Sequence, residues 1–383
     1  MCADWQTDCV GGRRQGRLWV EWVDSIESTN LALMQRPVLV PDGGMVGGTQ
    51  TGAAEHTRAI SQADLAGGTG AALQSGLTGG IGAVPWTGPA GGMVEAPAAV
   101  WLMAGEQTGG RGRRGKVWRS LPGEAMTASF GRELSPGQLE SPGVVPLVAG
   151  IVVAEFLQTL GVPVRVKWPN DLCLLRDDAA QPLAKVGGIL CEMRSRGTGS
   201  RLVIGCGLNL LGVPQGLEAD QAVAALFRIG RDGFVDLGHA QASGGLWGDA
   251  PDIVGGASPG GAPALRPLWK AAGAGAADVK PDALMQQVAL GVGQALLAGT
   301  DQLLAEGFAA FAARWQRLDV LAGRPVRVHH ADGVREAVVL GIDASGGLQV
   351  RYEDGGATGP VVTLMAEQVS IRPRALEADR VIR

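Results

Sequence analysis

The sequence is poor in the residues from which disulfides and metal sites are built. Its 383 residues include only four histidines and five cysteines. The cysteines are Cys2, Cys9, Cys173, Cys191 and Cys206. They are odd in number, widely spaced and without a C-x-x-C pair, which argues against a disulfide framework and against a structural zinc site. We therefore expect a reducing, cytoplasmic location.

The chain also lacks a long hydrophobic run. Its N-terminus carries acidic residues and no apolar core of signal-peptide length. The longest apolar stretch, Val144–Leu157, contains Pro146 and Glu155 and is shorter than the ~20 residues that span a bilayer. We therefore predict a soluble protein without a membrane segment or a secretion signal.

Positive charge is not in excess either. Lys and Arg number 33 against 37 for Asp and Glu, which gives a net charge of −4. This balance argues against a protein that covers nucleic acid with a whole basic face, although it allows a local basic site. With 46% hydrophobic and 18% charged residues, the chain can form a folded core. Its length predicts about two to three domains.

Glycine and proline are abundant instead, with 61 and 21 residues. They concentrate in two stretches without a sustained period, at about 37–98 and 238–263, which we interpret as insertions.

Outside these two stretches the hydrophobic pattern is regular. Trp19–Met34 predicts a strand, a polar turn at Ser28–Asn30 and a helix, and Pro146–Leu160 predicts a buried helix. Strands are predicted at 98–106, 125–132, 164–168, 171–175, 186–194 and 201–209, and a further helical region at 284–317. The expected fold is α+β, with a mixed, mostly antiparallel sheet backed by helices.

After Leu321 the sequence changes to short alternating strands. Five are predicted, at 326–329, 336–342, 348–352, 361–364 and 369–372, with glycine turns between them. Five short strands in so few residues predict a small β-barrel. The domain boundary is expected between Asp319 and Gly323.

The most unusual local sequence is the loop GRGRRGK at 110–116, which we call the arginine loop. It matches G-x-G-x-x-G by its letters, but a dinucleotide-binding turn opens a helix, and Pro122 follows too soon for a long one. A P-loop requires a hydroxyl after its lysine, where Val117 stands. What the loop supplies is a cluster of cations that can bind phosphates in a forked geometry, and Trp118 adds a ring for base stacking. Taken alone, it could equally be a solvated basic loop or a segment that contacts RNA.

Two further motifs point to a bound anion. In Lys167-Trp168-Pro169-Asn170-Asp171, a lysine ends a predicted strand and an X-Pro turn follows, which fixes its ammonium group in space. Lys185 precedes a predicted strand with a Gly187-Gly188 pair, and G-C-G-L-N at 205–209 repeats small residues on the next strand. Such glycines suggest space for a flat ligand, but each could instead mark a β-bulge or a tight strand crossing.

Together, and in this order, S-T-N at 28–30, E-Q-T-G-G-R-G-R-R-G at 106–115, K-W-P-N-D at 167–171, K-V-G-G-I-L at 185–190 and G-C-G-L-N at 205–209 closely resemble the biotin protein ligases. The resemblance covers about residues 19–232, and more loosely the C-terminal strands. It implies a class II synthetase-like ligase core at 19–318 that carries the two insertions, an SH3-like C-terminal barrel at 319–373, a lead at 1–18 and a tail at 374–383. The lead is too short for the DNA-binding domain of the bifunctional members, so we expect the form without it and without repressor activity.

The resemblance also implies a reaction. Biotin and ATP would form biotinyl-5′-adenylate, with Mg²⁺ expected, and the biotinyl group would pass to a lysine of the biotin carboxyl carrier protein of acetyl-CoA carboxylase. Lys167 and Arg111 would be the catalytic residues. The implied biotin-binding residues are Ser28, Thr29, Asn30, Gln107, Gly110, Arg111, Lys167, Gly205 and Gly207. The implied nucleotide-binding residues are Arg113, Arg114, Gly115, Trp118, Asn170, Lys185 and Asn209.

Two alternatives remain open at this point. A lipoate protein ligase shares the implied fold and the adenylate chemistry, but its acyl chain lacks the ureido head that would explain Ser28, Thr29 and Gln107. A nucleic-acid-binding regulator would use the arginine loop for phosphates, although our expectation is no nucleic-acid partner and no membrane partner. Lys116 stands where the family usually has an arginine, which weakens forked phosphate binding. The sequence assigns no metal ligands, no oligomeric state and no role for either insertion.

Overall fold

The structure is a computed structural model. It describes residues 6–8, 14–36, 57–59, 99–176, 178, 181–214, 222–229, 235–236, 280–353, 359–366 and 369–374. The expected insertion at 238–263 lies outside these described residues, and of the insertion at 37–98 only 57–59 are among them.

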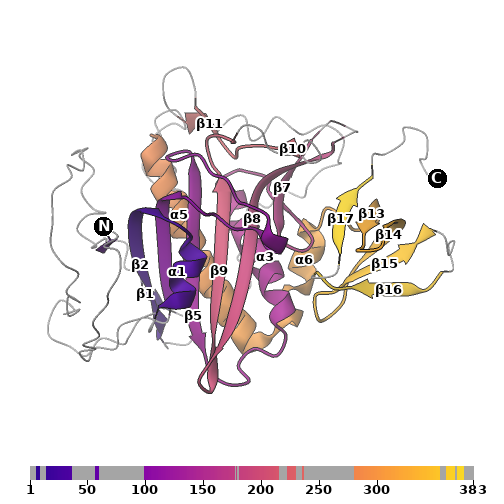
Figure 1. The fold of residues 1–383 in the computed structure, drawn as a ribbon, viewed down its shortest axis with the longest axis horizontal. Helices are drawn as coiled ribbons and strands as arrows, with labels where there is room; N and C mark the ends of the chain where they lie inside the picture. The colour runs from indigo at the N-terminus through magenta and orange to yellow at the C-terminus, as the bar shows by residue number, and fades with distance from the viewer. Residues whose placement is uncertain are drawn as a thin grey trace.

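One large sheet dominates the described part of the chain (Figure 1). Its ten strands follow the order β1-β2-β4-β5-β9-β8-β7-β6, with β3 beside β2 and β10 beside β8. All neighbours are antiparallel except β2–β4 and β8–β10. The strands are β1 (Gln6–Asp8), β2 (Arg14–Ile26), β3 (Thr57–Ala59), β4 (Ala99–Gln107), β5 (Ala125–Leu134), β6 (Arg165–Lys167), β7 (Asp171–Leu175), β8 (Leu183–Arg196), β9 (Gly199–Asn209) and β10 (Ala222–Val223). The predicted mostly antiparallel α+β core is confirmed.

The predicted strands between 98 and 209 are all present, with shifted ends. Several strands begin earlier than expected, among them β2 and β8. β2 begins at Arg14, before the expected start of the core at Trp19. β8 begins at Leu183, so Lys185 lies inside the strand rather than before it. A further pair, β11 (Arg228–Ile229) and β12 (Val235–Asp236), forms a separate antiparallel hairpin.

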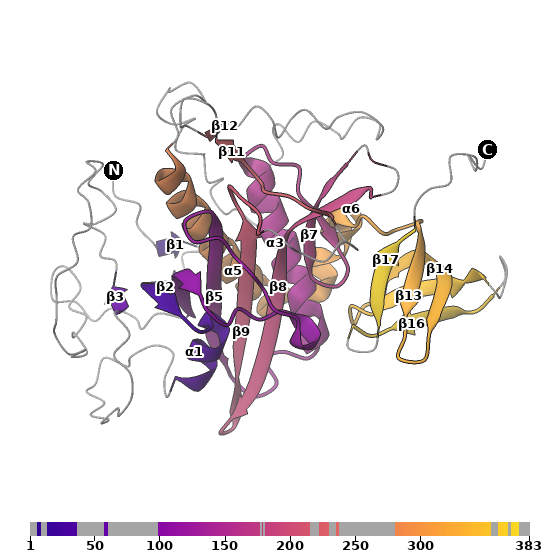
Figure 2. The same cartoon turned by 45° about the horizontal axis from the view of Figure 1, so that its top comes forward.

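Both faces of the sheet are buried at β4. The side chains of β4 alternate between two apolar cores: Ala99, Trp101 and Met103 belong to one, and Val100, Leu102 and Ala104 to the other. The second core includes Leu33 of helix α1 (Thr29–Gln35). The first core lies beneath α3 (Val145–Thr159) and α5 (Pro281–Glu306), on the face opposite α1 (Figures 1 and 2).

Helix α3 is buried along almost its whole length because it packs against β6, β7 and β8 and against α5, which itself contacts β2, β4 and β5. Gly291 of α5 permits this close packing, since a methyl group there would collide with the ring of Phe156. By length and composition alone, the helical segments 142–159 and 281–306 could each cross a membrane. However, 67% and 56% of the most apolar 18-residue stretch of each segment are buried within the protein, and core helices share this property.

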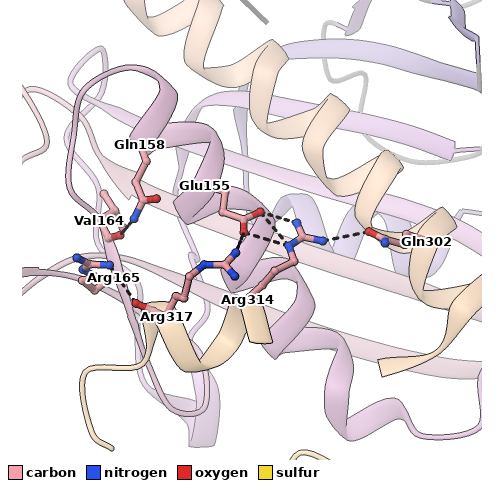
Figure 3. A network of polar contacts seen from close by, with 7 residues as sticks. All are labelled: Glu155, Gln158, Val164, Arg165, Gln302, Arg314 and Arg317. Carbon is pink, nitrogen blue, oxygen red and sulfur yellow. Dashed lines mark hydrogen bonds and ion pairs between the residues drawn. The ribbon is translucent and has the colours of Figure 1, made fainter. Parts of the chain in front are cut away.

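A polar network ties α3 and α5 to α6 (Ala312–Leu318) on this face of the sheet (Figure 3). Glu155 of α3 accepts a hydrogen bond from Nε of Arg314 at 3.0 Å and lies 3.7 Å from Nη2 of Arg317. Arg314 also donates to Gln302 of α5 at 3.0 Å. Arg165 then donates to the carbonyl of Arg317 at 3.0 Å, which joins α6 to β6. The network therefore fixes the strand that ends in Lys167.

The chain passes from this region into a second sheet at Asp319. The backbone amide of Val320 donates to the carbonyl of Val166 at 3.0 Å, and that of Leu321 donates to Oδ1 of Asp319 at 2.8 Å. Burial raises the pKa of Asp319 to about 6, although the hydrogen bond from Leu321 partly opposes the shift. This turn lies where the domain boundary was expected.

The second sheet has five antiparallel strands in the order β16-β15-β14-β13-β17. They are β13 (Pro325–His329), β14 (Val334–Ile342), β15 (Leu348–Tyr352), β16 (Val361–Leu364) and β17 (Ser370–Pro373). The five predicted strands are confirmed. Closure into a barrel is not, because within the described residues β16 and β17 form the two edges of an open ladder.

The two sheets meet at Trp168. Its ring is buried, and its Nε1 donates to the carbonyl of Gly346 at 2.9 Å, in the turn between β14 and β15. That turn is held by Asp343, whose Oδ1 accepts from the backbone amides of Ser345 and Gly347, both at 2.9 Å. Gly346 has a φ of +84°, which favours glycine. The second sheet is therefore fixed directly beside the residue that follows Lys167.

Candidate active site

The predicted motifs converge on one pocket of about 210 Å³. Its wall is built by α1, the end of β4, the arginine loop, the turn between β6 and β7, parts of β8 and β9, and residues 369–372 at β17. Most residues assigned from the sequence lie in this wall: Ser28, Thr29, Asn30, Gln107, Arg111, Arg113, Arg114, Trp118, Lys167, Asn170, Lys185, Gly205 and Gly207. The structure thus brings together residues that are up to 179 positions apart (207 − 28).

Three assigned residues lie outside the wall. Gly110 faces the backbone of Trp118, whose amide donates to its carbonyl at 2.9 Å, and this approach leaves no room for a side chain. Gly115 has a φ of +71° and turns the loop. Asn209 is buried and donates to the carbonyl of Ala224 at 3.4 Å. The structure therefore gives these residues roles in shaping the backbone, and contact with a ligand stays a prediction for them.

One part of the pocket is polar and uncharged. Ser28 caps helix α1 by accepting from the amide of Leu31 at 3.4 Å. The amide of Thr29 donates to Oε1 of Gln107 at 2.8 Å, which leaves the Gln107 amino group available to the pocket. The hydroxyl oxygens of Thr29 and Ser129 lie 2.6 Å apart. This arrangement presents hydrogen-bond donors and acceptors in fixed positions.

Asn30 has a structural role beside these groups. Its Nδ2 donates to the carbonyl of Leu190 at 3.2 Å and to Oε2 of Glu192 at 2.9 Å, and its Oδ1 accepts from Ser129 at 2.5 Å. Gly205 makes room for it, because a methyl group there would collide with Oδ1 of Asn30. Both amide protons of Asn30 are thus used within the protein. The small residue at 205 accommodates a protein side chain instead of leaving space for a flat ligand.

The arginine loop folds as a short hairpin. Arg111 and Val117 form an isolated antiparallel bridge, and the amide of Gly112 donates to the carbonyl of Lys116 at 2.7 Å. A single 3₁₀ turn, η1 (Arg113–Gly115), occupies its tip, with Arg114 in the left-handed region at φ +57°. No α-helix follows before β5 in this fully described segment. The structure therefore excludes the dinucleotide-binding geometry that the glycine spacing imitates.

Arg113 reaches across to two other parts of the wall. Its Nη1 donates to Oδ1 of Asn170 at 3.2 Å, and its Nη2 donates to the carbonyl of Ala366 beyond β16. Asn170 is itself fixed, because its Nδ2 donates to the carbonyl of Ile189 at 2.7 Å. The loop is therefore held against both sheets.

Two lysines converge on one carboxylate in the pocket wall. Nζ of Lys167 lies 3.1 Å from Oδ2 of Asp171, and Nζ of Lys185 lies 2.6 Å from Oδ1. Burial alone would raise the pKa of Asp171, but the ammonium groups of Lys185 and Lys167 outweigh burial and hold it well below its usual range. Two cations and one anion leave a net positive charge. That charge suits the binding of an anion such as a phosphate.

Trp118 lies over strand β9. Its ring fills the space above Gly207, where a Cβ would be 2.5 Å from the indole. Nζ of Lys185 is 5.9 Å from the ring centroid. The indole Nε1 is buried and has no hydrogen-bond partner among the described residues. Stacking of Trp118 on a nucleotide base stays a prediction, and Gly207 accommodates the ring.

The pocket thiol is not a nucleophile at neutral pH. Burial raises the pKa of Cys206, which lies between Gly205 and Gly207 in the wall, to about 12. In the described part of the chain, no group of three or more His, Cys, Asp or Glu residues could hold a metal ion. The pocket wall offers hydrogen-bonding groups and fixed cations to a ligand.

Sequence reasoning missed several residues of the site. Asp171 belongs to the K-W-P-N-D motif, but the sequence assigned it no role. Ser129 and Glu192 belong to none of the motifs. Residues 369–372 were assigned only to the C-terminal strands, yet they line the pocket. Asp171 could have been suspected from its position four residues after Lys167, across a hairpin turn. The other contacts depend on how distant segments pack.

Comparison with known proteins gives consistent matches. The family model described as "Biotin/lipoate A/B protein ligase family" matches residues 96–209. The bifunctional ligase/repressor BirA of Salmonella typhimurium is 28% identical over 272 residues, 70% of this chain and 64% of that protein. BirA of Escherichia coli is 43% identical over 106 residues, 27% of this chain and 30% of that protein. The matches therefore span less than two thirds of the length of these relatives.

Among solved structures, the biotin protein ligase from Aquifex aeolicus in complex with biotin and ATP is similar in fold. Its TM-score is 0.50 at 18% sequence identity, covering 92% of this chain and 98% of that chain. This likeness concerns the fold alone, which it supports over almost the whole of both chains.

Proposed function

We propose that this chain is an ATP-dependent biotin protein ligase of the biotin/lipoate A/B protein ligase family, as the family model over residues 96–209 and the similarity to BirA support. In the first step, a biotin carboxylate oxygen attacks the α-phosphorus of ATP, and the bond to pyrophosphate breaks, which gives biotinyl-5′-adenylate. In the second step, a lysine amine of a biotin carboxyl carrier protein attacks the acyl carbon, AMP leaves, and the amine loses a proton. Relatives named biotin–[acetyl-CoA-carboxylase] ligase from Paracoccus denitrificans and Mycobacterium tuberculosis support this acceptor.

One observation carries the proposal: the uncharged polar groups and the cations lie next to each other along the same ladder. In the β8–β9 pairing, Leu190 faces Gly205 and Gly188 faces Gly207. Asn30 lies over Gly205, whereas Asp171 with its two lysines is paired with Gly188. A cyclic urea bound beside Asn30 and a phosphate bound beside Asp171 and its lysines would be about two residues apart, roughly 7 Å along a strand.

The residues of this chain have distinct roles in the proposed reaction. Ser28, Thr29 and Gln107 bind the ureido ring. Lys167 lies where the carboxylate meets the α-phosphate, and its ammonium group neutralises two approaching anions and the charge of the transition state. Arg111 closes over the biotin side, and the arginine loop with Lys185 compensates the triphosphate charge. Because the groups are held by the fold before ligands arrive, little reorganisation is needed at the reacting centre.

Mg²⁺ is expected with the nucleotide. Such an ion is usually held by one or two carboxylates and by substrate phosphates. The carboxylate in the pocket wall, Asp171, is already shared by two lysines. We therefore propose that the ion arrives bound to the ATP phosphates, where it would neutralise charge, and we assign it no protein ligand.

The test is biotin-dependent exchange of labelled pyrophosphate into ATP by the purified chain, followed by mass spectrometry of the adenylate. Exchange with biotin and none with lipoate supports the proposal. Lipoate-dependent exchange instead would favour the lipoate branch, which the family description also covers. No exchange with either acid would overturn it. A steeply salt-dependent shift of DNA or RNA mobility would favour a nucleic-acid-binding regulator.

We also propose the finer features expected from the resemblance. The five-stranded C-terminal sheet would be an SH3-like barrel at 319–373, attached to a ligase core at 19–318. The enzyme would act in the cytoplasm, which agrees with the unpaired state of Cys173, Cys191 and Cys206. Labelling of a purified carrier domain at its lysine, detected by peptide mass spectrometry, would test the acceptor.

A further inference from the structure

Glu192 continues the row of β8 residues that faces the pocket. Side chains on a strand alternate between its two faces, so Gly188, Leu190 and Glu192 share a face. Gly188 and Leu190 line the pocket, and Glu192 lies just beyond them, about one quarter exposed. Nothing in the sequence motifs singled it out.

The two carboxylate oxygens of Glu192 bind two different parts of the site. Oε2 accepts from Nδ2 of Asn30 at 2.9 Å, and Oε1 lies 3.2 Å from Nη2 of Arg111. Asn30 belongs to α1, and Arg111 belongs to the arginine loop. One side chain of the sheet therefore connects the loop to the helix that carries Ser28 and Thr29.

The connection continues into the polar part of the pocket through Ser129. Oδ1 of Asn30 can only accept, so the Ser129 hydroxyl donates to it and its single proton is used. The Thr29 hydroxyl lies 2.6 Å from the Ser129 oxygen and can also donate to Oε1 of Gln107 at 3.1 Å. Contacts from Thr29 through Ser129 and Asn30 thus lead to the carboxylate that holds Arg111. A change at Glu192 is transmitted to both the loop and Asn30.

The Arg111 end of this connection is the one that can open. Arg111 is 48% exposed, and an ion pair with that exposure contributes little to stability because water screens it. At the other end, Nδ2 of the buried Asn30 donates to a charged oxygen of Glu192, which makes this the stronger contact. An incoming anionic group can therefore take Arg111 from Glu192 while Asn30 stays in place.

We propose that Glu192 is a positioning residue that holds the arginine loop at the edge of the pocket before ligands bind and yields Arg111 to the ligand. The identity of that ligand rests on the proposed function. The holding contact does not, because both of its partners belong to this chain. Glu192→Gln keeps an oxygen for Asn30 and removes the charge opposite Arg111. Glu192→Ala removes both contacts.

The first experiment is limited proteolysis of the full chain by trypsin without ligands, with cleavage sites assigned by mass spectrometry. We expect E192Q to increase cleavage after Arg111, Arg113, Arg114 and Lys116 by about two- to fivefold over wild type, the range of one exposed ion pair, and E192A to increase it further. The control is Glu336→Gln, which breaks a similarly exposed pair with Arg374 on the C-terminal sheet. It should leave loop cleavage unchanged.

Cleavage after Arg335 in the C-terminal sheet corrects for general loss of stability. A loop-to-Arg335 cleavage ratio in E192Q equal to that of wild type would overturn the proposal. The second experiment is pyrophosphate exchange, where we expect KM for biotin to rise about two- to fivefold in E192Q and KM for ATP to stay constant. If the wild type shows no exchange with biotin, the proposed function fails, while the ligand-free cleavage still decides the role of Glu192.

Discussion

Nζ of Lys167 lies 3.1 Å from Oδ2 of Asp171, and both side chains are buried. The two residues face each other across the β6–β7 hairpin. Because the other oxygen of Asp171 binds Lys185, a single carboxylate sets the separation of the two ammonium groups. The cationic part of the pocket is therefore built around an acidic residue.

Asp171→Asn should lower the free energy of unfolding by about 3 kcal/mol at neutral pH, because the removal of one partner leaves buried charge uncompensated. Chemical denaturation measures this change. The matched control is Asp178→Asn, whose partner Arg176 lies at 3.6 Å and whose side chain is 43% exposed. That substitution should change stability by less than about 0.5 kcal/mol. Equal effects of the two substitutions would contradict this account of Asp171.

Asp319→Asn should stabilise the protein at neutral pH. Burial raises the folded-state pKa of Asp319 from 3.8 to about 6, so the folded chain binds this proton more tightly than the unfolded chain. The contribution of Asp319 to the free energy of unfolding is therefore most favourable below about pH 4. It declines from pH 4 to 6 and is constant above that. The variant should gain on the order of 2 kcal/mol at pH 7. Denaturation at several pH values checks this, and a wild-type-to-variant difference that does not change between pH 4 and 7 would count against it.

Lys167→Ala should reduce biotin-dependent pyrophosphate exchange about 10²- to 10³-fold, the loss typical of one electrostatic donor to a transition state. The fold should survive, since Asp171 keeps its contact with Lys185. Lys280→Ala, at the exposed start of α5, is the control for removal of a lysine. Near-normal exchange in the Lys167 variant would remove Lys167 from its assigned role.

Gly205→Ala and Gly207→Ala should impair different substrates. A methyl group at 205 displaces Asn30, and one at 207 displaces the Trp118 ring, from which its Cβ would be 2.5 Å away. We expect the first to raise KM mainly for biotin and the second mainly for ATP, each by about tenfold or more, as for an overpacked site. Steady-state exchange kinetics separate the two. Gly150→Ala, where the new Cβ would be an ordinary 3.5 Å from Val166, is the control and should leave both constants unchanged.

The sequence predicted much of the fold because its core elements have strong local patterns. The apolar run at 146–160 could only be a buried helix, and α3 spans Val145–Thr159. Ser28 was recognisable as part of a helix start, and it caps α1. The short strands after Leu321 were each bounded by turn residues. Most of the assigned site residues lie in one pocket because they sit on neighbouring strands or on the loops that join elements of the same sheet.

The features that the sequence did not predict depend on strand pairing and side-chain packing, which local patterns do not specify. A register shift between Leu172 and Cys173 sets how β7 meets β8, and so where Asp171 lies relative to Lys185. The glycines at 205 and 207 were interpreted as space for a ligand, whereas protein side chains from α1 and the arginine loop fill that space. The contribution of residues 369–372 to the pocket follows from the docking of the second sheet, which no motif reports.

The hydrogen bond from Trp168 to the Gly346 carbonyl has a consequence for engineering. A chimera that exchanges the C-terminal sheet with that of a relative will keep its pocket intact only if the grafted piece carries a turn shaped like 343–347. A graft with a different turn would leave the buried Nε1 of Trp168 without a hydrogen-bond acceptor. The C-terminal sheet therefore cannot be exchanged without regard to this turn.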